Sequence, residues 1–296
     1  MNSLKLGLGT VQFGLNYGIS NMEGPPSLEE IKNILEKACL NGIRVLDTAA
    51  QYGESELALG QATKPSSPFQ IVTKTPNFKS VSSISTDEVT YLKNTFQNSL
   101  KSLNKSLIYG VLVHHCDDVL KPGGHLLIDA LNAIKKLGLV EKIGVSVYHP
   151  EEALFVAERW DIDLIQCPMN IFDQRFLQQG CLEFLKKKGI EIHTRSTFLQ
   201  GLLLMDFDEM PDCFNRYKAH FHEFKMCLEQ QRVSALEAAL GFSLGVQWVD
   251  TVLCGVVSQN QLNEIIVGSS IQLENNIFKE LALNDLNILD PSRWRI

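Results

Sequence analysis

A repeated order of helix, glycine and short apolar strand constrains the fold of this chain more than any other feature. In its clearest copy, residues 27–40 have apolar side chains at helical spacing, Gly42 follows the helix, and residues 43–47 form an apolar run. The same order returns around Gly138 and around Gly189, each time ahead of another apolar run. A glycine just past a helix can adopt the left-handed backbone conformation that turns the chain back toward a strand. The repeat therefore predicts helices and strands in alternation.

Eight such strands are predicted, and helical patterns separate them. They cover residues 5–10, 43–47, 70–74, 108–114, 142–146, 164–167, 190–193 and 251–255. Short apolar strands that alternate with helices indicate a parallel sheet covered on both faces. Eight units in 296 residues fit an α/β fold of the closed (β/α)8 TIM-barrel type, with residues 1–296 in one domain. The alternative is an open doubly wound sheet, but residues 7–14 lack the G-x-G-x-x-G turn that such a sheet normally has after its first strand.

Two segments depart from this alternation. Residues 200–233 form a long insertion after the seventh strand, in which we predict a loop and a helix at about residues 213–230. Residues 273–296 add a further C-terminal helix and an extended end. Because barrel enzymes carry their sites at the C-terminal ends of the strands, we expect the insertion to cover the site as a partial lid.

Charge, hydropathy and cysteine usage narrow the possible partners and compartments. The net charge is −7 and no run of basic residues stands out, which argues against nucleic acid or an anionic membrane as partner. No signal peptide is recognised, and no apolar stretch is long enough to span a bilayer. The seven cysteines are scattered and never spaced C-x-x-C, which is typical of a reduced protein without disulfides or a zinc site. We expect a cytoplasmic monomer or homo-oligomer that binds no metal.

Four polar side chains follow consecutive predicted strands. Asp47, Lys74 and His114 end the second, third and fourth strands, and Tyr52 lies one short turn after Asp47. Since the C-terminal ends of barrel strands meet at one face, we expect these side chains to share a pocket. Carbonyl reduction needs a proton on oxygen, and a phenol can supply it if a neighbouring ammonium lowers the pKa of that phenol. Lys74, held by Asp47, would do this for Tyr52, while His114 would hold the carbonyl oxygen by a hydrogen bond.

The same segments resemble the aldo-keto reductases over nearly the whole chain. Three segments are similar to the first three strand motifs of that family, and three more to its fourth to sixth: LGLGTVQFG at 6–14, VLDTAAQYG at 45–53, VTK at 72–74, LVH at 112–114, IGVS at 143–146 and QCPMN at 166–170. The resemblance implies that Asp47, Tyr52, Lys74 and His114 form the catalytic tetrad, with Tyr52 as general acid. It also implies reduction of an aldehyde or ketone, such as a sugar, by a nicotinamide cofactor. His115 adjoins His114, but side chains alternate along a strand, and counting from the preceding strand favours His114 as the one in the pocket.

The resemblance further implies that the cofactor binds extended across the barrel mouth. Ser146 and Gln166 match positions that hold the carboxamide, and Arg195 stands where many members stack a tyrosine on the nicotinamide ring. Ser258 and Gln261 have the spacing of a capping box, which marks a helix start whose amides can face a phosphate. The implied cofactor contacts are Gly9, Thr10, Asp47, Ser146, Gln166, Arg195, Gly255, Val257, Ser258 and Gln261. The resemblance implies NADP rather than NAD as the cofactor. The sequence gives this choice only weak support, because Gly255 and Gln261 stand where NADP-selective members of the family have basic residues.

Two other functions stay open. Lys74 could attack a carbonyl as an amine and form a Schiff base, although a neighbouring Asp47 would keep it protonated. A reductase-like subunit could instead bind the nucleotide and regulate a partner with little turnover. The substrate has no readable sequence code, because the insertion, the tail and Arg195 are expected to shape the pocket. A sugar is suggested only by Arg195 and by Gln51, which lies next to Tyr52.

Overall fold

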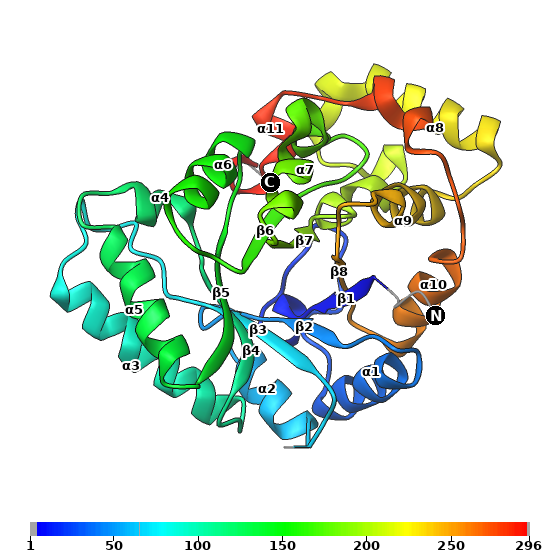
Figure 1. The fold of residues 1–296 in the computed structure, drawn as a ribbon. Coiled ribbons are helices and arrows are strands. Elements are labelled where there is room, and N and C mark those ends of the chain that lie inside the picture. The colour runs from blue at the N-terminus through cyan, green and yellow to red at the C-terminus, as the bar shows by residue number, and fades with distance from the viewer. Residues whose placement is uncertain (1–4, 65, 295–296) are drawn as a thin grey trace.

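The computed structural model describes residues 5–64 and 66–294, and its eight parallel strands close into a barrel (Figure 1). The strands are β1 (Leu6–Gly9), β2 (Val45–Asp47), β3 (Gln70–Lys74), β4 (Ile108–Val113), β5 (Val140–Ser146), β6 (Leu164–Pro168), β7 (Glu191–Arg195) and β8 (Thr251–Gly255). Each strand pairs in parallel with the next, and β8 pairs with β1. The predicted (β/α)8 barrel is therefore confirmed, and the open doubly wound sheet is wrong.

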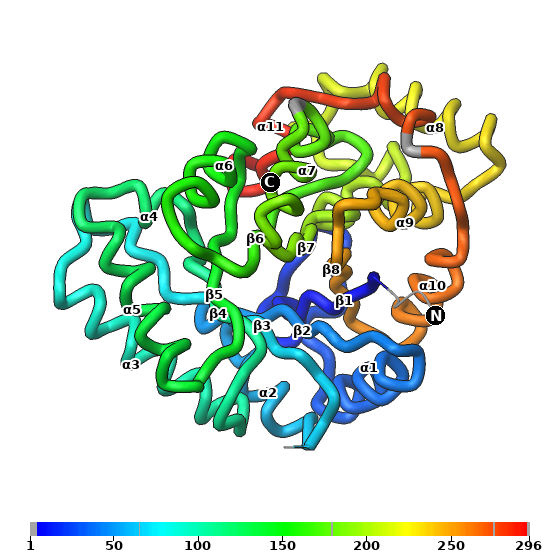
Figure 2. Tube along the Cα trace, viewed as in Figure 1, coloured from blue at the N-terminus to red at the C-terminus, as the bar shows by residue number. Residues whose placement is uncertain are grey.

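Helices cover the outside of the barrel, as the repeat predicts. They are α1 (Leu28–Leu40), α2 (Ser55–Ala62), α3 (Thr86–Ser102), α4 (Cys116–Leu120), α5 (His125–Lys136), α6 (Pro150–Arg159), α7 (Cys181–Lys187), α9 (Ala235–Gly245) and α10 (Gln259–Gly268). Ser27 caps the start of helix α1, because its Oγ accepts the backbone N–H of Glu30 at 3.2 Å. Along the chain trace, α1 lies beside α10, so the first and last repeats meet (Figure 2).

The interior of the barrel is filled by side chains in its middle and at its N-terminal end. A small apolar cluster fills the middle, made of Val45, Val72, Leu112, Leu164 and Leu253. At the N-terminal end, Glu191 accepts a hydrogen bond from Tyr109 Oη at 2.7 Å and forms an ion pair with Lys142. These side chains come from the first residues of β7, β4 and β5. The C-terminal end of the barrel is therefore where a cavity can form.

The insertion after β7 folds differently from the prediction. Its helix, α8 (Lys218–Gln231), begins later than residue 213, after short 3-10 helices at Leu199–Leu204, Phe207–Glu209 and Asp212–Tyr217. Phe221 and Phe224 of α8 pack on the ring of Phe172, with ring centroids 5.3 and 5.5 Å apart from it. Aromatic burial thus holds α8 at the periphery of the barrel, beside the C-terminal segment (Figure 1). Residues of α8 do not line the cavity, so only the first residues of the insertion, Gln200, Gly201 and Leu204, can cover the site.

The C-terminal segment adds less helix than predicted. It consists of a 3-10 helix at Asn275–Leu281, the four-residue α11 (Leu286–Leu289) and a 3-10 turn at Pro291–Arg293. The ring of Trp294 packs against Phe214, with centroids 5.0 Å apart, and its Nε1 donates to Ile288 O at 3.1 Å. Residues 295–296 of the predicted tail lie outside the described residues. The described tail covers the insertion rather than the barrel mouth.

We expect that replacing Gly144 by alanine will strongly destabilise the barrel. A Cβ atom at Gly144 of β5 would overlap the backbone carbonyl of Leu164 on β6, and strand backbone cannot move aside as a flexible side chain can. We predict that Gly144→Ala lowers the free energy of unfolding by about 3 kcal/mol or more, measured by denaturant unfolding followed by circular dichroism.

Gly138→Ala is the matched control for this substitution. Gly138 has a positive φ of 72°, but no atom lies within 4 Å of the Cβ position. Gly138→Ala should therefore lower the free energy of unfolding only by the backbone strain of a left-handed alanine, about 1–2 kcal/mol. Equal losses for the two variants would show that the close approach of β5 and β6 does not constrain residue 144.

Candidate active site

The innermost part of the site is a buried ion pair between Asp47 and Lys74. The parallel register of β2 and β3 brings the ends of these strands together, and Lys74 Nζ donates to Asp47 Oδ2 at 2.7 Å. The side chains are 1% and 7% exposed for Lys74 and Asp47, respectively. Lys74 Nζ also donates to Thr48 O at 2.9 Å, and Gln166 Nε2 donates to Asp47 Oδ1 at 2.7 Å. The free-energy cost of burying the two charges is thus offset by their close pairing and by these further hydrogen bonds.

Tyr52 is positioned directly over this ion pair. It lies in a short turn after β2, closed by the hydrogen bond from Tyr52 N to Ala49 O at 3.0 Å. Lys74 Nζ lies 3.5 Å from Tyr52 Oη and 5.0 Å from the centroid of its ring. The contact between phenol and ammonium that the sequence predicts is therefore present.

The effect of this contact on the acidity of Tyr52 differs from the prediction. Burial raises the pKa of Tyr52 well above its usual value, and the carboxylate of Asp47 raises it further, whereas Arg195 lowers it. Because Asp47 balances the charge of Lys74, the ammonium does not make the phenol more acidic overall. Burial likewise lowers the pKa of Lys74, and Asp47 opposes that change. Tyr52 is therefore a protonated phenol throughout the neutral pH range.

His114 rather than His115 faces the same cavity. The His114 ring meets the Tyr52 ring edge-on, with centroids 5.8 Å apart, and stacks on His115 at 4.7 Å. Burial, together with the charge of Lys74, lowers the pKa of His114 to about 2, so its imidazole is neutral. His114 Nδ1 is buried without a hydrogen-bond partner among the described residues. A neutral imidazole at this place can exchange a hydrogen bond with a bound molecule.

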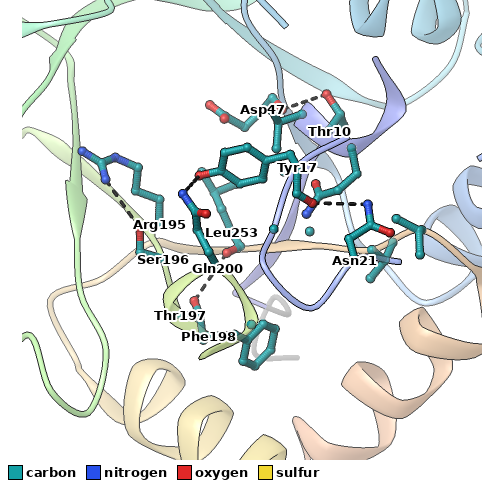
Figure 3. Close-up of a pocket in the computed structure, with 18 of the residues that line it drawn as sticks. Thr10, Tyr17, Asn21, Asp47, Arg195, Ser196, Thr197, Phe198, Gln200 and Leu253 are labelled. Atoms are coloured by element: carbon teal, nitrogen blue, oxygen red, sulfur yellow. Dashed lines mark hydrogen bonds between the residues drawn. The ribbon is translucent and has the colours of Figure 1, made fainter. Parts of the chain in front are cut away.

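All four tetrad candidates line one cavity of about 370 Å³ at the C-terminal end of the barrel. The predicted cofactor contacts that also line it are Gly9, Thr10, Asp47, Ser146, Gln166, Arg195, Gly255, Val257 and Gln261. Figure 3 shows part of this cavity, with Asp47 and Thr10 at one side and Arg195 at another. Ser258 is the exception, because its Oγ accepts the N–H of Gln261 at 3.2 Å and caps α10.

The start of α10 is less open to an anion than the sequence suggests. Val257 N donates to Gln261 Oε1 at 2.9 Å, and Gln259 N donates to Glu30 Oε1 of α1 at 2.6 Å. Side chains of the protein therefore occupy two amides that could face a phosphate. Glu264 of α10 also lines the cavity, so this end carries acidic groups. Within the described part of the chain, the lysine and arginine that line the cavity are Lys74 and Arg195.

The loop after β1 is a part of the site that the sequence did not reveal. Gln200 Nε2 donates to Tyr17 Oη at 3.0 Å, as Figure 3 shows. In addition, Ile19 N donates to Gln200 O at 3.1 Å. The loop after β1 and the first residues of the insertion thus meet at the cavity, which makes this part of the insertion the partial lid. Gly201 permits this close approach of the two segments, because a Cβ atom there would overlap Ser20 Oγ. Such contacts join residues far apart in sequence and leave no periodic pattern.

Two further observations limit the chemistry of the described residues. Within residues 5–64 and 66–294, no group of three or more His, Cys, Asp and Glu side chains is arranged to hold a metal ion. In the same residues, we find no helix with the length and apolar character needed to cross a membrane.

Comparisons with known proteins were made for the sequence and for the structure. The model of the aldo/keto reductase family matches residues 5–282. An aldo-keto reductase from Bacillus halodurans, in its holo form, has a TM-score of 0.75 at 19% identity, over 98% of this chain and 95% of that chain. A Pseudomonas aeruginosa protein named as an aldo-keto reductase has a TM-score of 0.67 at 21% identity, over 90% and 89%. The comparison with curated protein sequences gives no significant match.

Removing the ammonium should destabilise the protein because it leaves a buried carboxylate without its cation. We expect Lys74→Met to lower the free energy of unfolding by about 3–5 kcal/mol at pH 7. Lys187→Met is the matched control, since Lys187 pairs with Glu183 at 2.8 Å but the two side chains are 72% and 44% exposed. That variant should lose less than about 1 kcal/mol. Denaturant unfolding of both variants checks the prediction.

The stability deficit of Lys74→Met should also depend on pH. A buried carboxylate without a cation takes up a proton more readily than the same group in the unfolded chain. Between pH 7 and pH 5 the folded variant then binds more protons than its unfolded state, and lowering the pH favours folding. The loss of unfolding free energy relative to wild type should therefore be smaller at pH 5 than at pH 7. An equal loss at both pH values would contradict the conclusion that Lys74 compensates a buried carboxylate.

Proposed function

The chain belongs to the aldo/keto reductase family, and we propose that it reduces an aldehyde or ketone to an alcohol with Tyr52 as proton donor. The family implies a nicotinamide cofactor, NADH or NADPH, which supplies the hydride when bound. The observation that carries the proposal is the 3.5 Å contact of Lys74 Nζ with Tyr52 Oη, in a cavity that His114 also lines. A second tyrosine and lysine, Tyr109 and Lys142, meet at Glu191 with His193 nearby, but they lie at the N-terminal end of the barrel and do not line this cavity.

Several features of the cavity fit a nicotinamide cofactor. Gln166 Oε1 is buried without a hydrogen-bond partner in the described chain, and Ser146 is its neighbour in the register of β5 and β6. An amide group held there would donate to Gln166 Oε1 and contact the hydroxyl of Ser146. Gly9 adds room, because the nearest atom to a Cβ at that position is 3.9 Å away. These residues support the assignment of the carboxamide end to this side of the cavity.

The proposed reaction needs one proton from the protein. We place the carbonyl oxygen between Tyr52 Oη and the His114 ring, where both can contact it. As hydride reaches the carbonyl carbon, the oxygen gains negative charge and becomes a stronger base than phenolate. Tyr52 then transfers its proton to that oxygen although burial has raised its own pKa. Lys74 stabilises the phenolate that remains, and the phenol regains a proton from solvent.

A Schiff-base function for Lys74 has less support. Nζ has three hydrogen-bond acceptors around it, Asp47 Oδ2, Thr48 O and Tyr52 Oη. An ammonium has three N–H groups, so these acceptors match a protonated amine and leave no direction free for attack on a carbonyl. We therefore retain carbonyl reduction as the proposed reaction.

The choice between NADH and NADPH depends on the far end of the cavity. If the reacting ring lies at Tyr52, the rest of the dinucleotide extends toward α10. That end carries Glu264 and, at the helix start, Glu30, while its described lining has no lysine or arginine. The additional 2′-phosphate of NADPH would gain no cation there and would face negative charge. We therefore propose that NADH binds at least as well as NADPH, in contrast to the preference that the family suggests.

Two remaining expectations stay proposals. We propose a cytoplasmic location, which is supported by seven free cysteines. A sugar substrate has lost part of its support, because Gln51 does not line the cavity and its Oε1 accepts from Asn77 Nδ2 at 2.8 Å. Small carbonyl compounds in general remain the proposed substrate class.

Tyr52→Phe tests the proton-donor role. We expect kcat for an aldehyde to fall by about 10²–10⁴-fold, because the developing alkoxide loses its acid, while the dissociation constant of the cofactor changes only a few-fold. Tyr91→Phe, at a tyrosine that is 56% exposed, is the control and should keep the wild-type rate. Nicotinamide absorbance gives the rates and fluorescence titration gives the affinities. A normal rate for Tyr52→Phe would remove Tyr52 from the role, and tight nucleotide binding without reduction by the wild-type chain would favour a regulatory subunit.

The cofactor preference can be tested by binding alone. We expect the dissociation constant of NADPH to be no lower than that of NADH, measured by fluorescence titration at equal ionic strength. Glu30→Gln should strengthen NADPH binding several-fold relative to NADH, because it removes a carboxylate from the start of α10. Glu36→Gln changes an exposed carboxylate on the same helix and should leave the ratio unchanged. Markedly tighter binding of NADPH by the wild-type chain would overturn the proposal.

A further inference from the structure

Arg195 is a cation in the cavity that has no carboxylate partner. It ends β7, and its guanidinium carbon lies 4.3 Å from the centroid of the Tyr148 ring. Nη2 donates to Val147 O at 3.2 Å and Nη1 to Ser196 Oγ at 3.5 Å, the second of which is drawn in Figure 3. Among the described residues, no Asp or Glu oxygen lies within 4.0 Å of this side chain, and its Nε has no hydrogen-bond partner.

Arg175 shows how the same protein satisfies another half-buried arginine. Its Nε and Nη2 donate to the two carboxylate oxygens of Asp173, each at 2.7 Å. Asp173 is completely buried, so this pair is part of the packed structure. A planar guanidinium matches the two oxygens of a carboxylate in this bidentate way. Arg195 has the same donors but lacks such an acceptor within the protein.

Because Arg195 lacks a carboxylate partner, its charge determines the net charge of the proposed reaction centre. Asp47 and Lys74 cancel each other at 2.7 Å, and Tyr52 and His114 are both neutral. Arg195 therefore leaves the centre with one uncompensated positive charge. Its charge reaches the reacting groups, because it lowers the pKa of Tyr52 and of His114. Partial removal of a guanidinium from water costs free energy unless an anion or hydrogen-bond acceptors compensate it.

We propose that the carbonyl substrate carries a carboxylate group and that Arg195 binds it. This inference rests on the proposed function and names the substrate class of the same site. The carbonyl oxygen lies at Tyr52 and His114, and the carboxylate lies against the free edge of the guanidinium. Tyr148 covers one face of that guanidinium and holds it in place by stacking. Arg195 is then a specificity-determining residue, because it distinguishes an oxo acid from a neutral aldehyde of the same size.

A carboxylate fits this site better than a phosphate ester does. A carboxylate carries one negative charge and balances the single charge of Arg195. A phosphate monoester carries about −1.5 to −2 at neutral pH and has three acceptor oxygens. The described lining of the cavity supplies only one cation that is not already paired, Arg195 itself. The second negative charge would therefore stay uncompensated at the reaction centre.

Matched substrate pairs test this proposal. Succinic semialdehyde and its methyl ester differ in charge but share the reacting aldehyde, and glyceraldehyde 3-phosphate with glyceraldehyde forms the phosphate pair. We expect wild-type kcat/KM to be on the order of tenfold to a hundredfold higher for the acid than for the ester, with most of the difference in KM. Arg195→Gln should bring that acid-to-ester ratio close to one, and Arg195→Lys should give an intermediate ratio. Arg159→Gln removes an exposed guanidinium that stacks on Trp160 outside the cavity, and it should keep the wild-type ratio.

Binding of a non-reacting acid separates this proposal from the proposed function. Butanoate should raise the melting temperature of the wild-type chain, with and without bound cofactor, while butanamide should not, and Arg195→Gln should abolish the effect. If neither aldehyde of the first pair is reduced, the proposed reduction fails, but butanoate binding still tests Arg195.

Three results would overturn the role of Arg195 in substrate binding. The first is an equal kcat/KM for succinic semialdehyde and its methyl ester together with no effect of butanoate. The second is an acid-to-ester ratio that survives Arg195→Gln while the dissociation constant of the cofactor rises, which would assign Arg195 to the cofactor instead. The third is a larger charge preference in the phosphate pair than in the carboxylate pair.

Discussion

The buried pair of Asp47 and Lys74 is the interaction on which the rest of the site depends. Two charges inside a barrel are unfavourable unless each has close partners, and here Thr48 O and Gln166 Nε2 supply them at 2.9 and 2.7 Å. Those partners come from β6 and from the residue that follows β2, so the closed barrel has to form before the pair is satisfied. The fold and the chemistry of the site are therefore coupled through one interaction.

The zero net charge of this ion pair explains why the Tyr52 phenol stays protonated. An isolated ammonium at 3.5 Å would favour the phenolate, but the carboxylate beside it cancels that effect, and burial raises the pKa of Tyr52. The ground state therefore keeps its proton. In the reaction that we propose, the same ammonium stabilises the phenolate that is left once Tyr52 has given its proton to the alkoxide-like oxygen. An interaction that strengthens only as charge develops lowers the barrier without tightening ground-state binding.

The parts of the fold that the sequence predicted are those with local periodicity. Residues 70–74 and 251–255 are strands with the predicted bounds, and Asp47 and Lys74 meet because parallel strands end at one face of the barrel. Only the first residues of the insertion after β7 reach the cavity, because α8 is held at the periphery by its contacts with Phe172, far away in sequence. Glu30 of α1 accepts a hydrogen bond from Gln259 at the start of α10, 229 residues away in sequence, and nothing near either residue signals the contact. Local patterns thus gave the barrel, while tertiary contacts decide which groups reach the cavity.

The distribution of charge along the cavity has consequences that the tetrad alone does not show. Near Tyr52 and His114 the cavity holds Arg195, a cation without a carboxylate partner among the described residues, whereas the end at α10 carries Glu264 and, from α1, Glu30. This charge distribution favours negative charge near β7 over negative charge near α10, and a dinucleotide bound along the cavity, as we propose, would be subject to it. Substrate and cofactor would then be selected by the same field: an anionic substrate gains at Arg195, and an extra phosphate at α10 does not. The four proposed tetrad residues do not determine that selection by themselves, because it depends on the residues around them.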